Sequence, residues 1–219
     1  MKYLSFSLWG DKPIYNIGAI RNAELWKNIY SDWKMVVFYD SSVPKNTIDS
    51  LNSLDVECID MTDKNIYGMF WRFFVVDLEN SEYCIFRDSD SRISVREKMA
   101  VDEWLNSGKT LHVMRDHPYH MIPCGNDRLG ILGGMWGIKS KKIPLTKIIQ
   151  NYPNKSKIFY GEDQTFLKTI YSLFEKDRCT HDEFFEKKLF PINRENGRFI
   201  GERIDENENP LTDDYKMVL

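Results

Sequence analysis

Asp88 and Asp90 are the residues whose types and spacing most clearly suggest chemistry. They are separated only by Ser89 and follow an apolar run from Tyr83 to Phe86. Carboxylates at positions i and i+2 of a turn can converge on one cation, and Mg²⁺ and Mn²⁺ prefer such hard oxygen ligands. Two charges this close repel each other unless a cation lies between them. Because Asp and Ser also favour turns for purely local reasons, a structural turn is the alternative.

The residues before this turn alternate between strand and helix patterns. Strand patterns cover residues 3–8, 35–39, 56–59 and 83–86, and helix patterns lie between them. This alternation predicts an α/β fold in one domain, 1–219, with a mainly parallel, Rossmann-like mixed sheet flanked by helices. Ligands of such sheets bind beyond the carboxyl ends of the strands, which is where Asp88 and Asp90 fall.

The second half of the chain is less regular. Gly133 and Gly134 lie within an apolar stretch, residues 131–138, that is typical of a strand. Glycine there marks the close approach of a ligand or another backbone, or else a bulge. Asp163 and Gln164 begin a helix pattern, where an acidic residue is favoured whatever its function. The acidic tail from residue 202 to 214 is expected at the surface.

Composition restricts the class of protein. The net charge of −3 and the scattered Lys and Arg residues argue against a nucleic-acid partner. The four cysteines form no CxxC pair, which favours a reducing, cytoplasmic location. The N-terminus does not have the pattern of a signal peptide, and no apolar run approaches the ~20 residues of a transmembrane helix. A zinc site at His117, His120 and Cys124 would lack an evident fourth ligand.

Four short motifs in this order resemble glycosyltransferase family 8. They are the aromatic and Arg-containing segment 69–73, the apolar strand with D-x-D at 83–90, the small-residue segment 132–138, and Asp-Gln-Thr-Phe-Leu at 163–167. The order of motifs covers roughly residues 67 to 182. The whole chain also resembles small bacterial and large-virus glycosyltransferases of the GT-A type, chlorovirus proteins among them.

The resemblance implies a GT-A fold in which residues 1–92 bind the nucleotide and residues 93–219 bind the sugar and acceptor. Asp90 would ligate Mn²⁺ or Mg²⁺ directly, and Asp88 would bind the metal, the ribose or both. His181 would be a third metal ligand. Arg72 would support the turn and face the nucleotide. The donor would be a nucleoside diphosphate sugar, with UDP as the expected nucleotide, bound by residues that also include Ser7, Leu8, Trp9 and Ser89.

The same resemblance implies sugar and acceptor contacts in the second half. Asp163 and Gln164 would be catalytic residues. Asp116 is a third catalytic candidate, which the sequence suggests because it follows another predicted strand end. By their own positions in the sequence, Gly133 and Gly134 would form a floor for the sugar, and His117 would hold the sugar or a hydroxyl-bearing acceptor such as a glycan. Trp136 would line a carbohydrate cleft. The family's C-terminal H-x-x-G-x-x-K-P-W motif, which contributes a metal ligand and a diphosphate contact, is missing here. The basic residues available for the diphosphate are Arg194, Arg198 and Arg203.

The expected reaction is therefore metal-dependent transfer of a sugar to a hydroxyl, with retention or inversion left open. A haloacid-dehalogenase-like phosphatase also places D-x-D after an apolar strand, but usually near the N-terminus, whereas here three other strand patterns precede that strand. A nucleotidylyltransferase would need a glycine-rich loop after the first strand, and Ser-Leu-Trp-Gly at 7–10 is not one. A non-catalytic nucleotide- or carbohydrate-binding module remains the non-enzymatic alternative.

Overall fold

The computed structural model describes residues 1–121, 123–124 and 128–219. The chain begins with β1 (Lys2–Leu8), α1 (Pro13–Ile29), β2 (Lys34–Tyr39), α2 (Lys45–Ser53), β3 (Glu57–Asp60), the 3-10 helix η1 (Gly68–Asp77) and β4 (Tyr83–Phe86). It continues with α3 (Val95–Ser107), β5 (Leu111–Arg115), the 3-10 helix η2 (Pro118–His120), β6 (Pro123–Cys124), β7 (Arg128–Leu129) and β8 (Trp136–Lys139). The last elements are α4 (Leu145–Gln150), α5 (Glu162–Leu173), β9 (Arg178–Asp182) and the 3-10 helix η3 (Asp214–Val218).

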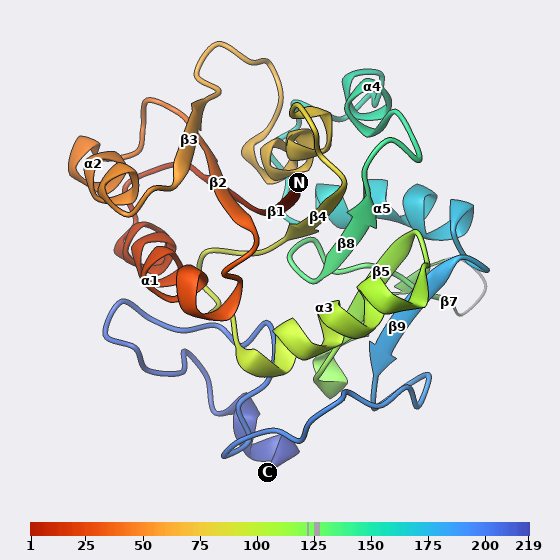
Figure 1. The fold of residues 1–219 in the computed structure, drawn as a ribbon. Coiled ribbons are helices and arrows are strands. Elements are labelled where there is room, and N and C mark those ends of the chain that lie inside the picture. The colour runs from red at the N-terminus through yellow and green to blue at the C-terminus, as the bar shows by residue number, and fades with distance from the viewer. Residues whose placement is uncertain (122, 125–127) are drawn as a thin grey trace.

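The described strands form a seven-stranded sheet in the order β3-β2-β1-β4-β8-β5-β9, and β6 pairs with β7 separately. β1 is parallel to β2 and β4, β2 to β3, and β5 to β9, whereas β8 is antiparallel to both of its neighbours. The predicted α/β class with a mainly parallel mixed sheet is therefore confirmed. Figure 1 shows the sheet running between two groups of helices.

Each face of the sheet is covered by its own layer. Apolar residues of α1, α2 and α3 pack on one face, and those of η1, α4 and α5 pack on the other. In β2, Met35 and Val37 belong to the first core and Val36 and Phe38 to the second, as expected from the two-residue period of a strand. Burial of one large apolar side chain contributes about 1.5–3 kcal/mol, so both layers stabilise the sheet substantially.

Two expectations about the second half are corrected. Gly133 and Gly134 lie in a turn before β8 and not within a strand. The C-terminal tail, residues 202–214, is only partly at the surface, because Glu202 and Ile204 are buried. The Ile204 amide donates to the Asp90 carbonyl at 2.7 Å, which brings the tail back to the aspartate turn. Burial of this tail depends on contacts with distant segments, which local composition does not encode.

No helix among the residues that the structure describes is both long and apolar enough to cross a membrane.

Candidate active site

The candidate site lies at the edge of the sheet where β1 and β4 end. These two strands are parallel neighbours, so their carboxyl ends meet at this edge. Asp88 and Asp90 directly follow β4, and Trp9 directly follows β1. Residues 1–92 thus bring both of these segments to one place, as the sequence predicts.

Arg72 of η1 joins the two halves of the chain. Its Nη1 donates to the Asp88 carboxylate and to the Arg87 carbonyl, and its Nη2 donates to Asp163 Oδ2 at 2.9 Å. The guanidinium is buried, so its charge depends on these two carboxylates. Burial opposes the charged form, but Asp88 and Asp163 outweigh it, and the pKa of Arg72 is raised.

Two serines of β1 hold the backbone of Arg72. Ser7 Oγ accepts from the Arg72 amide at 2.9 Å, and Ser5 Oγ donates to the Arg72 carbonyl at 2.7 Å. Both hydroxyls occupy positions of a buried strand where apolar residues would otherwise pack. Ser7 therefore acts on the site through Arg72, and Ser5 is a supporting residue that the sequence prediction missed. Two hydroxyls at i and i+2 within an otherwise apolar strand could have revealed it.

The two aspartates of the turn differ in environment. The Asp88 side chain is 51% exposed, whereas that of Asp90 is 11% exposed and accepts from Arg203 Nε at 2.8 Å. Burial, followed by repulsion from Asp88, raises the pKa of Asp90, although Arg203 opposes this. The pair thus presents one accessible carboxylate and one shielded carboxylate on the same turn.

Helix α1 supports the back of the turn. Asn22 Nδ2 donates to the Ser91 carbonyl at 2.8 Å, and Asn22 Oδ1 accepts from the Ile93 amide at 3.0 Å. A Cβ on Gly18 would lie 2.0 Å from the Ser89 carbonyl oxygen, so only glycine allows the helix to approach this closely. Ser89 is buried beneath the turn, which makes it part of the support for the two carboxylates.

Gly133 and Gly134 leave room for the charged cluster. A Cβ on Gly133 would lie 2.0 Å from Asp163 Oδ2, and a Cβ on Gly134 would lie 2.1 Å from Asp88 Oδ2. The close approach expected from these glycines is thus to carboxylate side chains of the chain itself. Any contact between the two glycines and a sugar remains a prediction.

Asp163 and Gln164 lie in the first turn of α5. Gly161, with φ of 84°, precedes the helix in the left-handed conformation that favours glycine. Asp163 Oδ1 accepts from the Gln164 amide at 2.9 Å, and Oδ2 accepts from Arg72. Burial, partly offset by Arg72, raises the pKa of Asp163. The structure brings Asp163 to the aspartate turn, while Gln164 is half-buried beside it.

Aromatic rings line the end of β1. Trp9 packs edge-on against Tyr67 and Trp71, with ring centroids 5.6 and 6.1 Å apart, and it remains partly exposed. A Cβ on Gly68 would lie 2.5 Å from the Trp9 ring. Trp9 is thus partly accessible at the strand end. Leu8 is buried in the core, so only its backbone is available to a ligand.

Trp136 does not lie at the surface of the site. It is fully buried and packs against Phe73 and Phe86, with ring centroids 5.2 and 4.3 Å away. This corrects the expectation that it contacts sugar. An aromatic residue in a glycine-rich segment suggested a carbohydrate platform, but the strand alternation of β8 turns it into the core.

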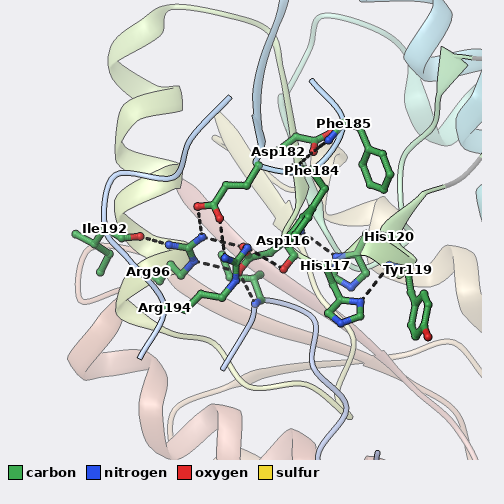
Figure 2. A network of polar contacts seen from close by, with 12 residues as sticks. Arg96, Asp116, His117, Tyr119, His120, Asp182, Phe184, Phe185, Ile192 and Arg194 are labelled. Carbon is green, nitrogen blue, oxygen red and sulfur yellow. Dashed lines mark hydrogen bonds and ion pairs between the residues drawn. The ribbon is translucent and has the colours of Figure 1, made fainter. Parts of the chain in front are cut away.

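Asp116 and His117 belong to a separate network, shown in Figure 2. Asp116 is fully buried, and its carboxylate accepts from Arg96 Nε and Nη2 at 3.0 and 2.8 Å, from Arg194, and from the Ile200 amide at 2.9 Å. His117 Nδ1 accepts from the Tyr119 amide at 3.1 Å. His117 Nε2 lies 3.1 Å from the Asp214 carbonyl. These contacts anchor the C-terminal segment. They correct the expected catalytic role of Asp116 and the expected substrate contact of His117.

His181 is also engaged elsewhere. Its Nδ1 lies 2.9 Å from His112 Nε2, and its Nε2 lies 3.0 Å from Glu103. It lies on β9, three strand positions from β4, and at about 4.8 Å per strand this places it roughly 14 Å from the aspartate strand. A metal–ligand bond is about 2 Å long, so His181 does not join Asp88 and Asp90 on one ion in this structure.

The zinc alternative gains no support from the described residues. His120 Nδ1 accepts from the Asp116 amide at 3.0 Å, and both ring nitrogens of His117 have backbone partners. The side chain of Cys124 lies outside the described residues. In the part of the chain that the structure describes, no three His, Cys, Asp or Glu side chains are grouped to hold a metal.

Asp88 and Asp90 nevertheless suit Mn²⁺ or Mg²⁺ in another way. Mg²⁺ is commonly held by one or two carboxylates, with phosphate oxygens and water completing the shell, and needs no all-protein cage. The two carboxylates offer that donor set. Arg203 already provides a positive charge against Asp90, which indicates that this carboxylate attracts a cation.

Of the three basic candidates for a diphosphate, only Arg203 contacts the aspartate turn. Arg194 is committed to Glu183 and Asp116, and Arg198 pairs with Glu202. Arg203 pairs with Asp90, and its own side chain is half exposed. Arg203 reaches the turn because the next residue, Ile204, donates its amide to the Asp90 carbonyl and so holds the tail there.

Comparisons with known proteins agree on the fold. No protein-family model matches the chain, and no curated protein matches it in sequence. Among solved structures, the galactosyltransferase LgtC in complex with donor and acceptor sugar analogues is similar with a TM-score of 0.54 at 12% identity, over 84% of this chain and 74% of that one. Mycobacterium tuberculosis glucosyl-3-phosphoglycerate synthase is similar with a TM-score of 0.52 at 10% identity, over 89% and 72%.

A Bacillus anthracis protein assigned as a glucose-1-phosphate thymidylyltransferase is also similar, with a TM-score of 0.54 at 12% identity, over 83% of this chain and 85% of that one. At these identities the likeness establishes the fold alone. The chain has the GT-A fold seen in nucleotide-sugar glycosyltransferases, as the sequence resemblance implied.

Proposed function

We propose that the protein is a glycosyltransferase that moves a sugar from a nucleoside diphosphate sugar, with UDP as the favoured nucleotide, to a hydroxyl of a glycan or related acceptor. One observation carries this proposal. The buried Arg72 guanidinium joins Asp88 of the turn after β4 to Asp163 at the start of α5. A carboxylate from each half of the chain is thereby held at the sheet edge where α/β folds bind ligands.

The donor side of the site would be formed by the turn after β4. Asp88 and Asp90 would hold Mn²⁺ or Mg²⁺, which when bound offsets the charge that grows on the departing diphosphate. Arg203 would exchange its contact with Asp90 for the diphosphate, to which a guanidinium is well matched. Trp9, which is partly exposed at the end of β1, would stack on the base. Arg72 would fix the direction of Asp88.

The acceptor side would be formed around α5. Asp163 already accepts two hydrogen bonds, but each carboxylate oxygen has a second lone pair that could accept from a sugar hydroxyl. Gln164 would lie beside the reacting carbon. The glycosidic carbon becomes oxocarbenium-like during transfer, so orientation of the acceptor hydroxyl and exclusion of water would supply most of the remaining catalysis.

Ligand-dependent stability provides the direct test. Thermal unfolding of the parent protein would be measured with UDP, GDP and dTDP, each with and without Mn²⁺. A ligand at ~100 times its dissociation constant adds about 2.7 kcal/mol of stability, so a UDP shift that requires Mn²⁺ is expected. Asp90→Asn should abolish that shift, whereas Asp49→Asn, an exposed aspartate of α2, should retain it. The absence of any nucleotide shift in the parent would overturn the proposal.

Product analysis separates the proposed activity from the alternatives. Incubation with UDP-sugars should release UDP, and addition of an acceptor should raise the rate of UDP release. Formation of a nucleotide sugar from a nucleoside triphosphate and a sugar 1-phosphate would instead indicate a nucleotidylyltransferase. Release of inorganic phosphate from simple phosphomonoesters would indicate a phosphatase. Binding of nucleotide with none of these reactions would indicate a binding module.

A further inference from the structure

Three consecutive large apolar side chains protrude from the segment between α4 and α5. Ile158, Phe159 and Tyr160 are 83%, 59% and 83% exposed. Soluble proteins seldom expose neighbouring apolar side chains to this extent unless the surface binds something. Figure 1 shows α4 at the periphery of the fold, and the segment that follows it leads into α5.

The exposure does not result from a lack of local structure. The Lys157 amide donates to the Asn154 carbonyl at 2.9 Å, and the Glu162 amide donates to the Phe159 carbonyl at 3.2 Å. The Lys155 carbonyl accepts from the Tyr67 amide of the neighbouring segment at 2.7 Å. Backbone hydrogen bonds thus fix the chain on both sides of these three residues, so their side chains protrude from ordered backbone.

The same segment is strongly basic. Residues 141–161 contain five lysines and no aspartate or glutamate. Because the whole chain carries −3 and this segment carries +5, the remainder carries −8. Four of the lysines are exposed, namely Lys141, Lys142, Lys147 and Lys157. The segment therefore combines a positive charge with protruding apolar side chains.

We propose that the surface formed by residues 157–160, together with the lysines of segment 141–157, docks on an anionic lipid bilayer. Aromatic and aliphatic side chains that enter the headgroup region, flanked by Lys, are the combination that binds proteins to anionic membrane surfaces. A protein partner fits less well, because Lys is depleted from protein–protein interfaces. Three side chains also cover little area compared with a stable interface.

The docking surface lies next to the candidate active site. The Lys155 carbonyl accepts from the Tyr67 amide at 2.7 Å, and the Tyr67 ring packs against Trp9 of the site, with ring centroids 5.6 Å apart. Gly161 and Asp163 follow directly in the chain. Docking would thus bring the candidate site near the bilayer. An acceptor hydroxyl carried on a lipid would then be within reach of the site. This last consequence rests on the proposed function, whereas docking itself does not.

The test is sedimentation of the full-length protein with lipid vesicles, without nucleotide or metal. The protein should bind phosphatidylcholine vesicles that contain phosphatidylglycerol, bind pure phosphatidylcholine weakly, and dissociate as salt is raised. Replacement of Ile158, Phe159 and Tyr160 by Ser should weaken binding at least about tenfold, and so should Lys147→Glu with Lys157→Glu. These exposed substitutions should leave the thermal midpoint unchanged, which verifies folding.

Matched controls use exposed residues elsewhere. Tyr119→Ser with Leu173→Ser removes two other exposed apolar side chains, and Lys45→Glu with Lys64→Glu reverses two other exposed lysines. Both controls should bind vesicles as the parent does. Failure of the parent to bind anionic vesicles, or equal loss in the controls, would overturn the proposal. Self-association that Phe159→Ser abolishes, without vesicle binding, would show a second copy to be the occupant and would overturn it too.

Because the readout requires no catalysis, vesicle binding can fail while nucleotide binding succeeds, or the reverse. The docking surface and the proposed function are therefore tested separately.

Discussion

Arg72 and Asp163 are 91 positions apart in the chain, yet they form a buried ion pair with Nη2 and Oδ2 2.9 Å apart. Arg72→Met should lower the free energy of unfolding by about 3–5 kcal/mol, because Asp163 would remain buried without its partner. Urea denaturation at neutral pH measures this loss. Asp163→Leu in the same chain should restore part of the stability, since it removes the unpaired charge.

A second buried ion pair provides the control. Arg115 and Asp182 lie 2.8 Å apart and are as buried as Arg72 and Asp163, but they lie at the ends of β5 and β9, two and three strand positions along the sheet from β4 and its aspartate turn. Arg115→Met should cost similar stability and preserve the Mn²⁺-dependent nucleotide shift. The stabilised Arg72→Met, Asp163→Leu protein should lack that shift. If the double variant retained the Mn²⁺-dependent nucleotide shift, the Arg72–Asp163 ion pair would serve stability alone.

Gly134→Ala should weaken nucleotide binding through a steric effect. The new Cβ would lie 2.1 Å from Asp88 Oδ2 and 2.8 Å from the Asp88 amide nitrogen, so Asp88 must move. We expect the dissociation constant for UDP with Mn²⁺ to rise at least about tenfold, because a displaced carboxylate loses its geometry for the ion. Isothermal titration calorimetry measures this change.

Gly108→Ala is the matched control for that substitution. Gly108 has φ of 71°, and a Cβ there would meet no atom within 4 Å. Alanine at this position costs about 1 kcal/mol of left-handed strain and no steric displacement. Its stability should fall while its UDP affinity remains that of the parent. Equal UDP affinity in Gly134→Ala would contradict the close contact with Asp88.

The first half of the fold could be predicted because its signals are local. The strand predicted at residues 83–86 has the same bounds as β4, since four apolar residues followed by Arg-Asp-Ser-Asp define both its burial and its end. The same pattern places Asp88 and Asp90 just beyond the end of this strand. Arg72 was assigned to the turn from the resemblance, and the structure adds its contact with Asp163.

The remainder depends on contacts between distant segments. Asp116 looked catalytic because it follows a strand, but Arg96 and Arg194, 20 and 78 positions away, use its oxygens to fasten the tail. His181 looked like a metal ligand by order in the sequence, and the sheet order places it three strands from β4. Strand order is a property of the assembled sheet, and no periodicity within a segment reveals it.

Arg203→Gln should weaken donor binding with little effect on folding. The Arg203 side chain is half exposed and donates to Asp90. A hydrogen bond of this kind to a charged group, such as a diphosphate, contributes about 1.5–3 kcal/mol. We expect UDP to bind roughly tenfold or more weakly at saturating Mn²⁺. Arg198→Gln, which removes an arginine of the same tail that pairs with Glu202, should bind UDP normally. Equal affinities for the two variants would exclude Arg203 from the donor site.

The stability of the protein should fall on mild acidification, and His112 should be one cause. His112 is fully buried, stacks on Trp104, and has its Nε2 2.9 Å from His181. Burial, followed by the charges of His181 and Arg87, holds the pKa of His112 well below its ordinary value of 6.5. As pH falls below 6.5, the unfolded chain takes up a proton at this position and the folded chain does not.

The unfolded state then binds more protons, so the free energy of unfolding decreases as pH falls, by at most about 1.4 kcal/mol per pH unit for one group. His112→Phe keeps a flat ring against Trp104 but cannot titrate. The His112→Phe variant loses the contact with His181 and should therefore be less stable at neutral pH. Its free energy of unfolding should nevertheless depend less steeply on pH below about 6.5. Urea unfolding of both proteins across this range measures the two slopes. Parallel curves would show that His112 does not contribute to the acid sensitivity.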